Sequence, residues 1–141
     1  MSSDLISEFV AGFLGLPPMN LIPGGSTLGS KLVLDNYLIP LSSRVSRLVE
    51  NGQLVTLGFR HDTVKVSAEK NSGSEIQLQG EVEALEPDYA QRTQIIYLRD
   101  GLWSFTGQCP LDMKLRVGQT IHVELDPERL YFFDTKSGLR L

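Results

Sequence analysis

The 141-residue sequence predicts a mostly β fold, an all-β barrel or sandwich, in one domain with a modest core. Two observations lead to this prediction. Short stretches of alternating apolar and polar residues recur after position 30, as in strands with one buried and one solvated face. Gly, Asp and Asn residues that favour turns separate these stretches at short intervals, which is typical of barrels and sandwiches.

The start of the chain is the exception, because residues 4–14 have the pattern of a helix. Suitable N-cap residues precede it, and its apolar side chains share one broad helical face. Gly15 and then Pro17 and Pro18 end the helix. A helix this apolar at a chain terminus is expected to pack against another surface.

The middle of the chain predicts a hairpin, a second short helix and a strand. In order, we expect strands at 31–34 and 37–40 around a turn at Asp35–Asn36, a helix at 44–51 capped by Ser43, and a strand at 53–60.

The alternation is clearest in residues 76–85. There Ile76, Leu78, Gly80, Val82 and Ala84 are expected on the buried face, opposite glutamine and glutamate. Two further strands are expected at 92–101 and 102–110, with a hairpin turn at Asp100–Gly101. Another strand is expected at 118–126, with Ile121, Val123 and Leu125 pointing inward. The last segment, 129–141, is expected to form strands around a turn at 135–138.

The charge and composition exclude several classes of function. The chain has 13 Lys and Arg against 17 Asp and Glu, a net charge of −4, so a nucleic-acid partner is not expected. It has no polybasic run and no apolar run long enough for a membrane span. A single cysteine, Cys109, cannot form an internal disulfide. We therefore expect a soluble, intracellular protein.

A glycine-rich segment, "PPMNLIPGGSTLGSK", resembles a phosphate-binding loop. Gly24 and Gly29 have the right separation, but Ser30–Lys31 reverses the Lys–Ser/Thr order of that motif. The residues after Lys31 alternate as in a strand, so the helix N-terminus that would bind phosphate is missing. The pattern favours a hairpin loop over a nucleotide site.

No other motif assembles an active site. His61 and Asp62 are adjacent, so on an extended segment they point to opposite faces, and His122 is expected on a solvated face. With two histidines and one cysteine, a standard zinc site is not expected. For Cys109, burial is favoured over a role as a nucleophile. Packing in the core is favoured over a stacking platform for the aromatic residues Trp103, Phe105, Tyr131, Phe132 and Phe133. The carboxylates of Glu81, Glu83 and Glu86 are expected on a solvated strand face and not in a catalytic pair.

Three stretches carry a family resemblance: "FVAGFLGLPPMNLIPG" at 9–24, "VTLGFRHDTVKV" at 55–66 and "VELDPERLYFFDTKSGLRL" at 123–141. In this order and spacing they resemble the C-terminal part of the ATP-binding subunits of bacterial ABC importers of the maltose and glycerol-3-phosphate type. The resemblance covers nearly the whole chain. It implies an oligonucleotide/oligosaccharide-binding-like barrel, also called molybdate-protein-like, with a short N-terminal helix and one further short helix.

The resemblance also implies a division of the chain and a set of site residues. Residues 1–16 would be a helix at the joint with an ATPase domain, and residues 17–141 a β-rich regulatory domain. The joint residues would be Phe9, Val10, Phe13, Gly15, Pro17, Pro18, Met19 and Asn20. The residues of the family's turns would be Gly58, Arg60, Asp62, Asp126, Pro127, Glu128, Arg129, Phe133, Asp134 and Gly138.

Two positions depart from the family's pattern. His61 stands where the family has a proline, and "DYAQRT" at 88–93 replaces a Leu-Gly-x-Glu turn. Neither a signature motif of the "LSGGQ" type nor an acidic Walker-B strand occurs in the 141 residues. The chain is therefore expected to be the regulatory part of a longer subunit, with no catalytic, metal or cofactor residues of its own.

The function implied is that of a non-catalytic regulatory and dimerisation domain in an importer of a carbohydrate or related small solute. Mg-ATP would bind to the full-length parent. The expected partners are a second copy of the ATPase subunit, the transporter's membrane subunits and a regulatory protein, with no nucleic acid. The expected location is cytoplasmic, at the inner face of the cell membrane.

Two alternatives remain open at this point. The first is a module of the same fold that binds a sugar or an oxyanion, for which Ser26, Thr27 and Lys31 are the candidate cluster. The second is a binder of single-stranded nucleic acid, which conflicts with the net charge.

Overall fold

The computed structural model describes residues 19–70, 73, 76–101 and 103–141. This part of the chain is mostly β, as predicted. The predicted helix at 4–14 and the joint residues Phe9, Val10, Phe13, Gly15, Pro17 and Pro18 lie outside the described residues. The chain divides into two compact units, one from Met1–Phe59 with Leu130–Leu141 (unit 1) and one from Arg60–Arg129 (unit 2).

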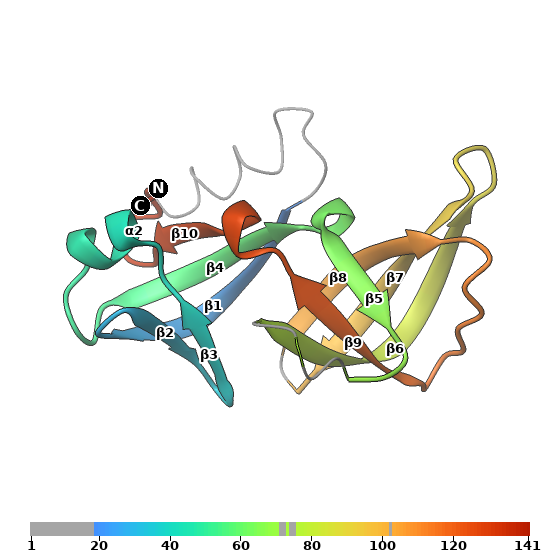
Figure 1. Cartoon of the computed structure of the whole chain (residues 1–141), viewed down its shortest axis with the longest axis horizontal. Helices are drawn as coiled ribbons and strands as arrows, with labels where there is room; N and C mark the ends of the chain where they lie inside the picture. The colour runs from blue at the N-terminus through green and yellow to red at the C-terminus, as the bar shows by residue number, and fades with distance from the viewer. Residues whose placement is uncertain (1–18, 71–72, 74–75, 102) are drawn as a thin grey trace. The chain divides into compact units, whose positions relative to one another are not determined.

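Unit 1 is built on a five-stranded sheet with the order β10-β4-β1-β2-β3 (Figure 1). Its elements are β1 (Met19–Leu28), β2 (Lys31–Leu34), β3 (Tyr37–Pro40), the helix α2 (Ser43–Leu48), β4 (Leu54–Arg60) and β10 (Tyr131–Asp134). The core of this unit consists of Ile22, Leu32, Leu34, Ile39, Leu41, Val45, Val55, Leu57, Phe59, Phe132 and Phe133.

Unit 2 contains the other five-stranded sheet, with the order β5-β9-β6-β7-β8. Its elements are η1 (His61–Thr63), β5 (Val64–Ser67), β6 (Gln77–Asp88), β7 (Thr93–Asp100), β8 (Trp103–Pro110), β9 (Thr120–Leu125) and η2 (Pro127–Arg129). The sheet curls, because its two outer strands β5 and β8 also contact each other. Its core consists of Ile76, Leu78, Val82, Ile96, Leu98, Phe105, Cys109, Ile121, Val123 and Leu125.

Several sequence predictions are confirmed at residue level. The strands predicted at 31–34 and 37–40 have these bounds, and Asp35 has the positive φ of 51° that a tight two-residue turn requires. The hairpin predicted around Asp100–Gly101 joins β7 to β8, although Asp100 still belongs to β7 and pairs with Trp103, and the turn begins at Gly101 with a φ of 61°. Ile121, Val123 and Leu125 are buried in β9.

The predicted short helix needs correction at both ends. It was expected at 44–51 with Ser43 as its cap, whereas α2 spans Ser43–Leu48. Ser42 is the N-cap, since its hydroxyl accepts a hydrogen bond from the Val45 amide at 3.2 Å. Val45 is the one buried residue of α2, and the backbone is extended again at Val49.

The expected burial pattern of β6 is wrong at Ala84. The alternation holds from Ile76 to Val82, but the register to β7 shifts between Val82 and Ala84, and Ala84 is exposed. A bulge adds one residue to one strand, so the next side chains change face. The strand β5 was not predicted, because only Val64 and Val66 alternate there.

The glycine-rich segment is mainly strand, not loop. β1 continues through Gly24 and Gly25 to Leu28, and only Gly29 and Ser30 form the hairpin turn to β2. Lys31 begins a strand, so the helix N-terminus of a phosphate-binding loop is absent from these described residues. The hairpin interpretation is confirmed at Gly29–Ser30 and is wrong for Gly24 and Gly25.

Thr27 is buried, with 2% of its surface exposed, and its hydroxyl joins two backbone segments. The hydroxyl donates to the Glu50 carbonyl and accepts from the Gln53 amide at 3.1 Å. Thr27 therefore has a structural role and is not accessible to the sugar or oxyanion for which it was a candidate. Of the other two members of that cluster, Ser26 is half-buried and Lys31 is exposed.

We expect Thr27→Val to lower the free energy of unfolding by about 1–3 kcal/mol, because the Glu50 carbonyl and the Gln53 amide each lose their hydrogen bond to the hydroxyl and keep only the bond to each other. Chemical denaturation measures this change. Thr27→Ser is the matched control, since it keeps the hydroxyl. A valine variant as stable as the wild type would contradict the structural role.

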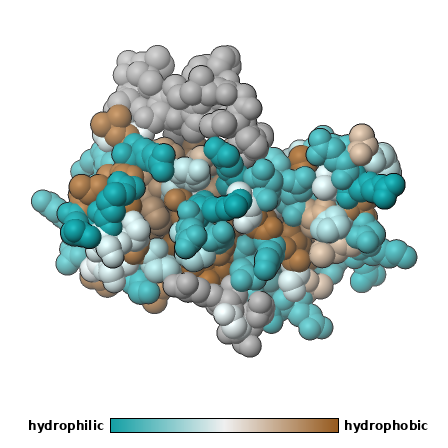
Figure 2. Space-filling view, turned by 45° about the horizontal axis from the view of Figure 1, so that its top comes forward, coloured by the Kyte–Doolittle hydropathy of each residue, from teal (hydrophilic) through white to brown (hydrophobic). Residues whose placement is uncertain are grey.

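Exposed apolar side chains are present on both units. Among the described residues, the exposed large apolar side chains include Leu28, Leu38, Leu48 and Leu139 on unit 1 and Tyr89 and Val117 on unit 2. On the face seen in Figure 2, hydrophobic residues are interspersed with hydrophilic ones. Within the described residues, no helix has the length and apolar character needed to cross a lipid bilayer.

Candidate functional site

Two of the predicted family turns meet at one end of unit 2. β5 and β9 are antiparallel neighbours, and Val64 pairs with Leu125. The turn η1 lies directly before β5 and the turn η2 directly after β9. Arg60 and Asp62 are therefore brought near the segment 126–129, although more than sixty positions separate them in the sequence.

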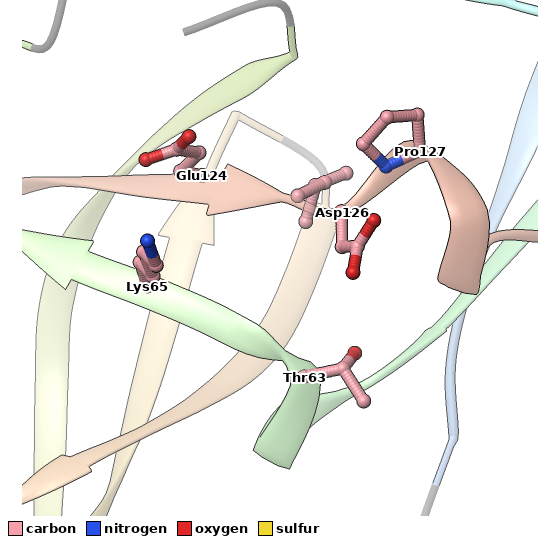
Figure 3. A pocket seen from close by; sticks show the side chains of 6 residues that line it. Thr63, Lys65, Glu124, Asp126 and Pro127 are labelled. Carbon is pink, nitrogen blue, oxygen red and sulfur yellow. The ribbon is translucent and has the colours of Figure 1, made fainter.

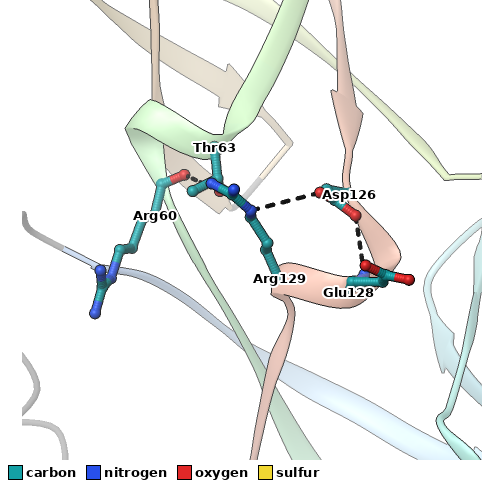
Figure 4. A network of polar contacts seen from close by, with 5 residues as sticks. All are labelled: Arg60, Thr63, Asp126, Glu128 and Arg129. Atoms are coloured by element: carbon teal, nitrogen blue, oxygen red, sulfur yellow. Dashed lines mark hydrogen bonds and ion pairs between the residues drawn. The ribbon is translucent and has the colours of Figure 1, made fainter.

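The two turns are held by local polar contacts (Figure 4). Asp126 accepts a hydrogen bond from the Glu128 amide at 3.0 Å, and its other carboxylate oxygen lies 3.6 Å from Arg129 Nε. Thr63 donates its hydroxyl to the Arg60 carbonyl at 2.9 Å, while the Arg60 side chain points away from this group. Asp126 and Arg129 are exposed, so their ion pair adds little stability. The Asp126 carboxylate mainly shapes the turn.

A pocket of about 230 Å³ lies beside these turns, within unit 2. It is lined by Thr63, Lys65, Glu124, Leu125, Asp126 and Pro127. Figure 3 shows the Thr63 and Asp126 side chains facing each other, with Lys65 and Glu124 projecting from the neighbouring strands. Lys65 and Glu124 are a cross-strand pair in the β5–β9 register. Among the described residues, neither side chain has a hydrogen bond or an ion pair.

A second group of predicted residues meets inside unit 1, at Gly58. A Cβ atom at this position would lie 2.9 Å from Met19 Sδ and 3.0 Å from Phe133 Cε2. These three residues come from the three separate stretches that carry the family resemblance. Gly58 is therefore needed for close packing. Asn20, the other described joint residue, is also buried.

The last predicted turn is organised by Asp134. Its carboxylate accepts hydrogen bonds from the Ser137 amide at 2.9 Å and from Gln53 Nε2 at 3.1 Å. Gly138 donates its amide to the Asp134 carbonyl at 2.7 Å and has a φ of 73°, which favours glycine. Hydrogen bonds from Ser137, together with the Gln53 bond and the charge of Lys136, hold the pKa of the Asp134 carboxyl below its ordinary value of 3.8.

Unit 1 is expected to lose stability in acid because of Asp134. A lowered pKa in the folded state means that this contribution is present above pH 3.8 and is lost as the pH falls through the folded pKa. We therefore expect Asp134→Asn to be less stable than the wild type at pH 7, with the difference disappearing in strong acid. Urea denaturation from pH 7 to pH 2 measures both. Ser137→Ala should reduce the acid-dependent loss, and a constant difference at every pH would contradict the prediction.

The remaining candidates from the sequence do not converge on a site. His61 lies in η1 and is half-exposed, and no group of three potential metal ligands is found among the described residues. Cys109 is buried, and burial raises the pKa of its thiol, so the interpretation as a core residue is confirmed. Phe105, Phe132 and Phe133 are also buried, which supports packing over a stacking platform.

The glutamates of β6 lie on a solvent-exposed face of the strand, as predicted. Glu81, Glu83 and Glu86 are exposed, Glu83 pairs with Arg99, and the Tyr97 hydroxyl donates to Glu86 at 2.5 Å. The hydrogen bond to Glu86 is the main reason that the pKa of Tyr97 is raised.

Sequence reasoning missed Thr63, Lys65 and Glu124 as site residues. The available signal was the alternation of "VKVS" at 64–67 and "TIHVEL" at 120–125, which places Lys65 and Glu124 on outward faces. The sequence contains no sign that these two segments are neighbours in one sheet.

The chain has curated relatives that are similar over nearly all of its length. The sn-glycerol-3-phosphate import ATP-binding protein UgpC of Yersinia pestis bv. Antiqua (strain Antiqua) is 33% identical over 140 residues, which is 96% of this chain and 36% of that protein. The xylose/arabinose import ATP-binding protein XacK of Haloferax volcanii is 30% identical over 132 residues, or 92% of this chain and 34% of that protein. The chain thus spans about a third of these relatives and matches their C-terminal part.

The fold has a counterpart among solved structures. The cytoplasmic molybdate-binding protein ModG superposes with a TM-score of 0.60 over 85% of this chain and 97% of that protein, at 12% sequence identity. At this identity the likeness concerns the fold alone. No protein-family model matches the chain.

Proposed function

We propose that this chain is the non-catalytic regulatory and dimerisation part of the ATP-binding subunit of an ABC importer for a carbohydrate or related small solute. The observation that carries the proposal is the match of 96% of the chain to the C-terminal part of UgpC. The curled sheet of unit 2 and the likeness to ModG support an oligonucleotide/oligosaccharide-binding-like barrel. Residues 1–16 would form the joint helix to the ATPase domain, and Mg-ATP would bind to that domain.

The proposal extends to partners and location. A second copy of the subunit and the transporter's membrane subunits would be the main partners, with a regulatory protein as a further one. The subunit would work at the cytoplasmic face of the membrane. Regulation would act through contacts that differ between the open and closed states of the ATPase pair, since a domain shifts an equilibrium only by interacting differently with its two states.

A chimeric subunit tests this function. This chain would replace the matching C-terminal part of UgpC, and uptake of glycerol 3-phosphate would be measured in cells that lack their own UgpC. We expect uptake above that of a UgpC truncated before this part. A stable, membrane-recruited chimera with no more uptake than the truncated protein would contradict the proposal. So would ATP binding by the isolated chain at micromolar concentration.

The likeness to ModG favours a second candidate, a module that binds a small ligand such as an oxyanion or a sugar. ModG itself has molybdate bound in the superposed structure. A thermal-shift screen of this chain with molybdate, sulfate and sugars separates the candidates. No stabilisation by any of these compounds would count against the binding module.

A further inference from the structure

One wall of the pocket beside η1 and η2 is held in place by hydrogen bonds within the protein. The Thr63 hydroxyl is oriented by its bond to the Arg60 carbonyl, and Asp126 is oriented by the Glu128 amide. Lys65 and Glu124 extend from two hydrogen-bonded strands in register. The Thr63 and Asp126 side chains therefore lose little entropy when a ligand binds, and the strand register keeps Lys65 and Glu124 beside them.

The charges of the lining residues restrict the class of ligand. Glu124 and Asp126 are carboxylates and Lys65 is the one cation of the lining, while Arg129 lies 3.6 Å from the Asp126 carboxylate, so the charges around the pocket nearly balance. A ligand with a net charge would therefore lie near a group of its own sign: an oxyanion or a nucleotide near Glu124 and Asp126, and an organic cation near Lys65 and Arg129. No lining residue is aromatic, and Leu125 is buried, so a flat apolar ligand lacks a stacking partner.

A neutral ligand with several hydroxyl groups fits this lining. Each hydroxyl can donate to Glu124 or Asp126 and accept from the Lys65 ammonium, so it satisfies groups of both signs at once. The volume of about 230 Å³ is below the roughly 300–1,000 Å³ of pockets for drug-sized molecules and suits a ligand of about the size of a monosaccharide.

We propose that this pocket is a binding site for a neutral polyol, in which Glu124 and Lys65 make the direct hydrogen bonds and Asp126 and Thr63 form the opposite wall. If the proposed importer function holds, a solute of this class would report its own cytoplasmic concentration to the transporter. The binding itself does not depend on that function, because it is a property of unit 2.

Solution NMR of the full chain tests the site with three probes: arabinose, glycerol 3-phosphate and glycine. We expect arabinose to shift the amide signals of residues 63–65 and 124–127 in a saturable way in the millimolar range. Glycerol 3-phosphate should bind more weakly because of its charge, and glycine should cause no saturable shift. Absence of saturable shifts with arabinose, or tighter binding of either charged probe, would overturn the proposal.

Two variants locate the site. Glu124→Ala and Lys65→Ala should each weaken arabinose binding about tenfold or more, the usual effect of losing a hydrogen bond to a charged group. Glu81→Ala and Lys114→Ala are matched controls outside the pocket and should bind like the wild type. Amide spectra without ligand verify that each variant is folded. If folded pocket variants bind arabinose as tightly as the control variants do, the proposed polyol site is wrong. This outcome would leave the proposed importer function to be tested separately by uptake in the chimera.

Discussion

Replacing Gly25 by alanine is expected to destabilise unit 1 by about 3 kcal/mol, the upper part of the range for overpacked cores. A Cβ atom at this position would lie 2.7 Å from Leu32 Cδ1 and 2.8 Å from the Val55 carbonyl oxygen. The leucine side chain can rotate away, but the carbonyl belongs to the backbone of β4, the strand next to β1. Relief therefore requires the two strands to separate. Urea denaturation measures the loss.

Gly107→Ala is the matched control for this substitution. Gly107 is also buried in a strand, but its added Cβ would meet Val66 and Val64 side chains at 3.4 and 3.5 Å, which is ordinary contact. We expect it to be neutral or slightly stabilising, since alanine loses less backbone entropy on folding than glycine. Equal losses of stability in the two variants would contradict the steric explanation.

Leu98→Ala is expected to lower the stability of unit 2 by about 2–5 kcal/mol. Leu98 is 2% exposed and lies in β7 opposite Val82 on one side and Phe105 on the other. These neighbours are held in strands and cannot collapse into the space that the side chain leaves, so a cavity remains. Leu98→Met is the control, because it roughly preserves volume and should cost less than about 1.5 kcal/mol.

The connectivity of the two units predicts where this loss appears. Unit 2 is one continuous segment, whereas unit 1 is assembled from residues on both sides of it. If unit 2 unfolds alone, residues 60–129 become a long loop that connects the two parts of a folded unit 1. The entropy cost of closing a loop rises only slowly with its length, so unit 1 can stay folded. In Leu98→Ala, hydrogen exchange should therefore accelerate first at amides of 60–129. Simultaneous acceleration in both units would contradict this.

The strands were predictable where alternation and turn residues agree. Ile121, Val123 and Leu125 alternate without interruption, and Asp100–Gly101 favours a tight turn, so both were predicted correctly from the sequence. The prediction was wrong at Gly25, because a sequence does not distinguish a glycine that allows close packing within a strand from a glycine that forms a turn. Ala84 was misplaced because a bulge depends on pairing with β7.

The candidate site was only half predictable, for a related reason. Asp126 and Pro127 were found through the family resemblance, whereas Lys65 and Glu124 lie inside the stretches that carry it but were not among the predicted turn residues. Their proximity is a consequence of the β5–β9 register, in which Lys65 pairs with Glu124. Register is set by which strands become neighbours, and local sequence patterns do not specify that choice.

The pairing of Val64 with Leu125 has a practical consequence for protein engineering. It brings the start of unit 2, after Phe59, and its end, before Leu130, to the same end of one strand pair. A segment whose two ends are neighbours can be transplanted as a cassette, and a short linker can join its ends in a circular permutant with new termini at another exposed loop. Unit 2 is thus suited to exchange between relatives, with 60 and 129 as the natural cutting points.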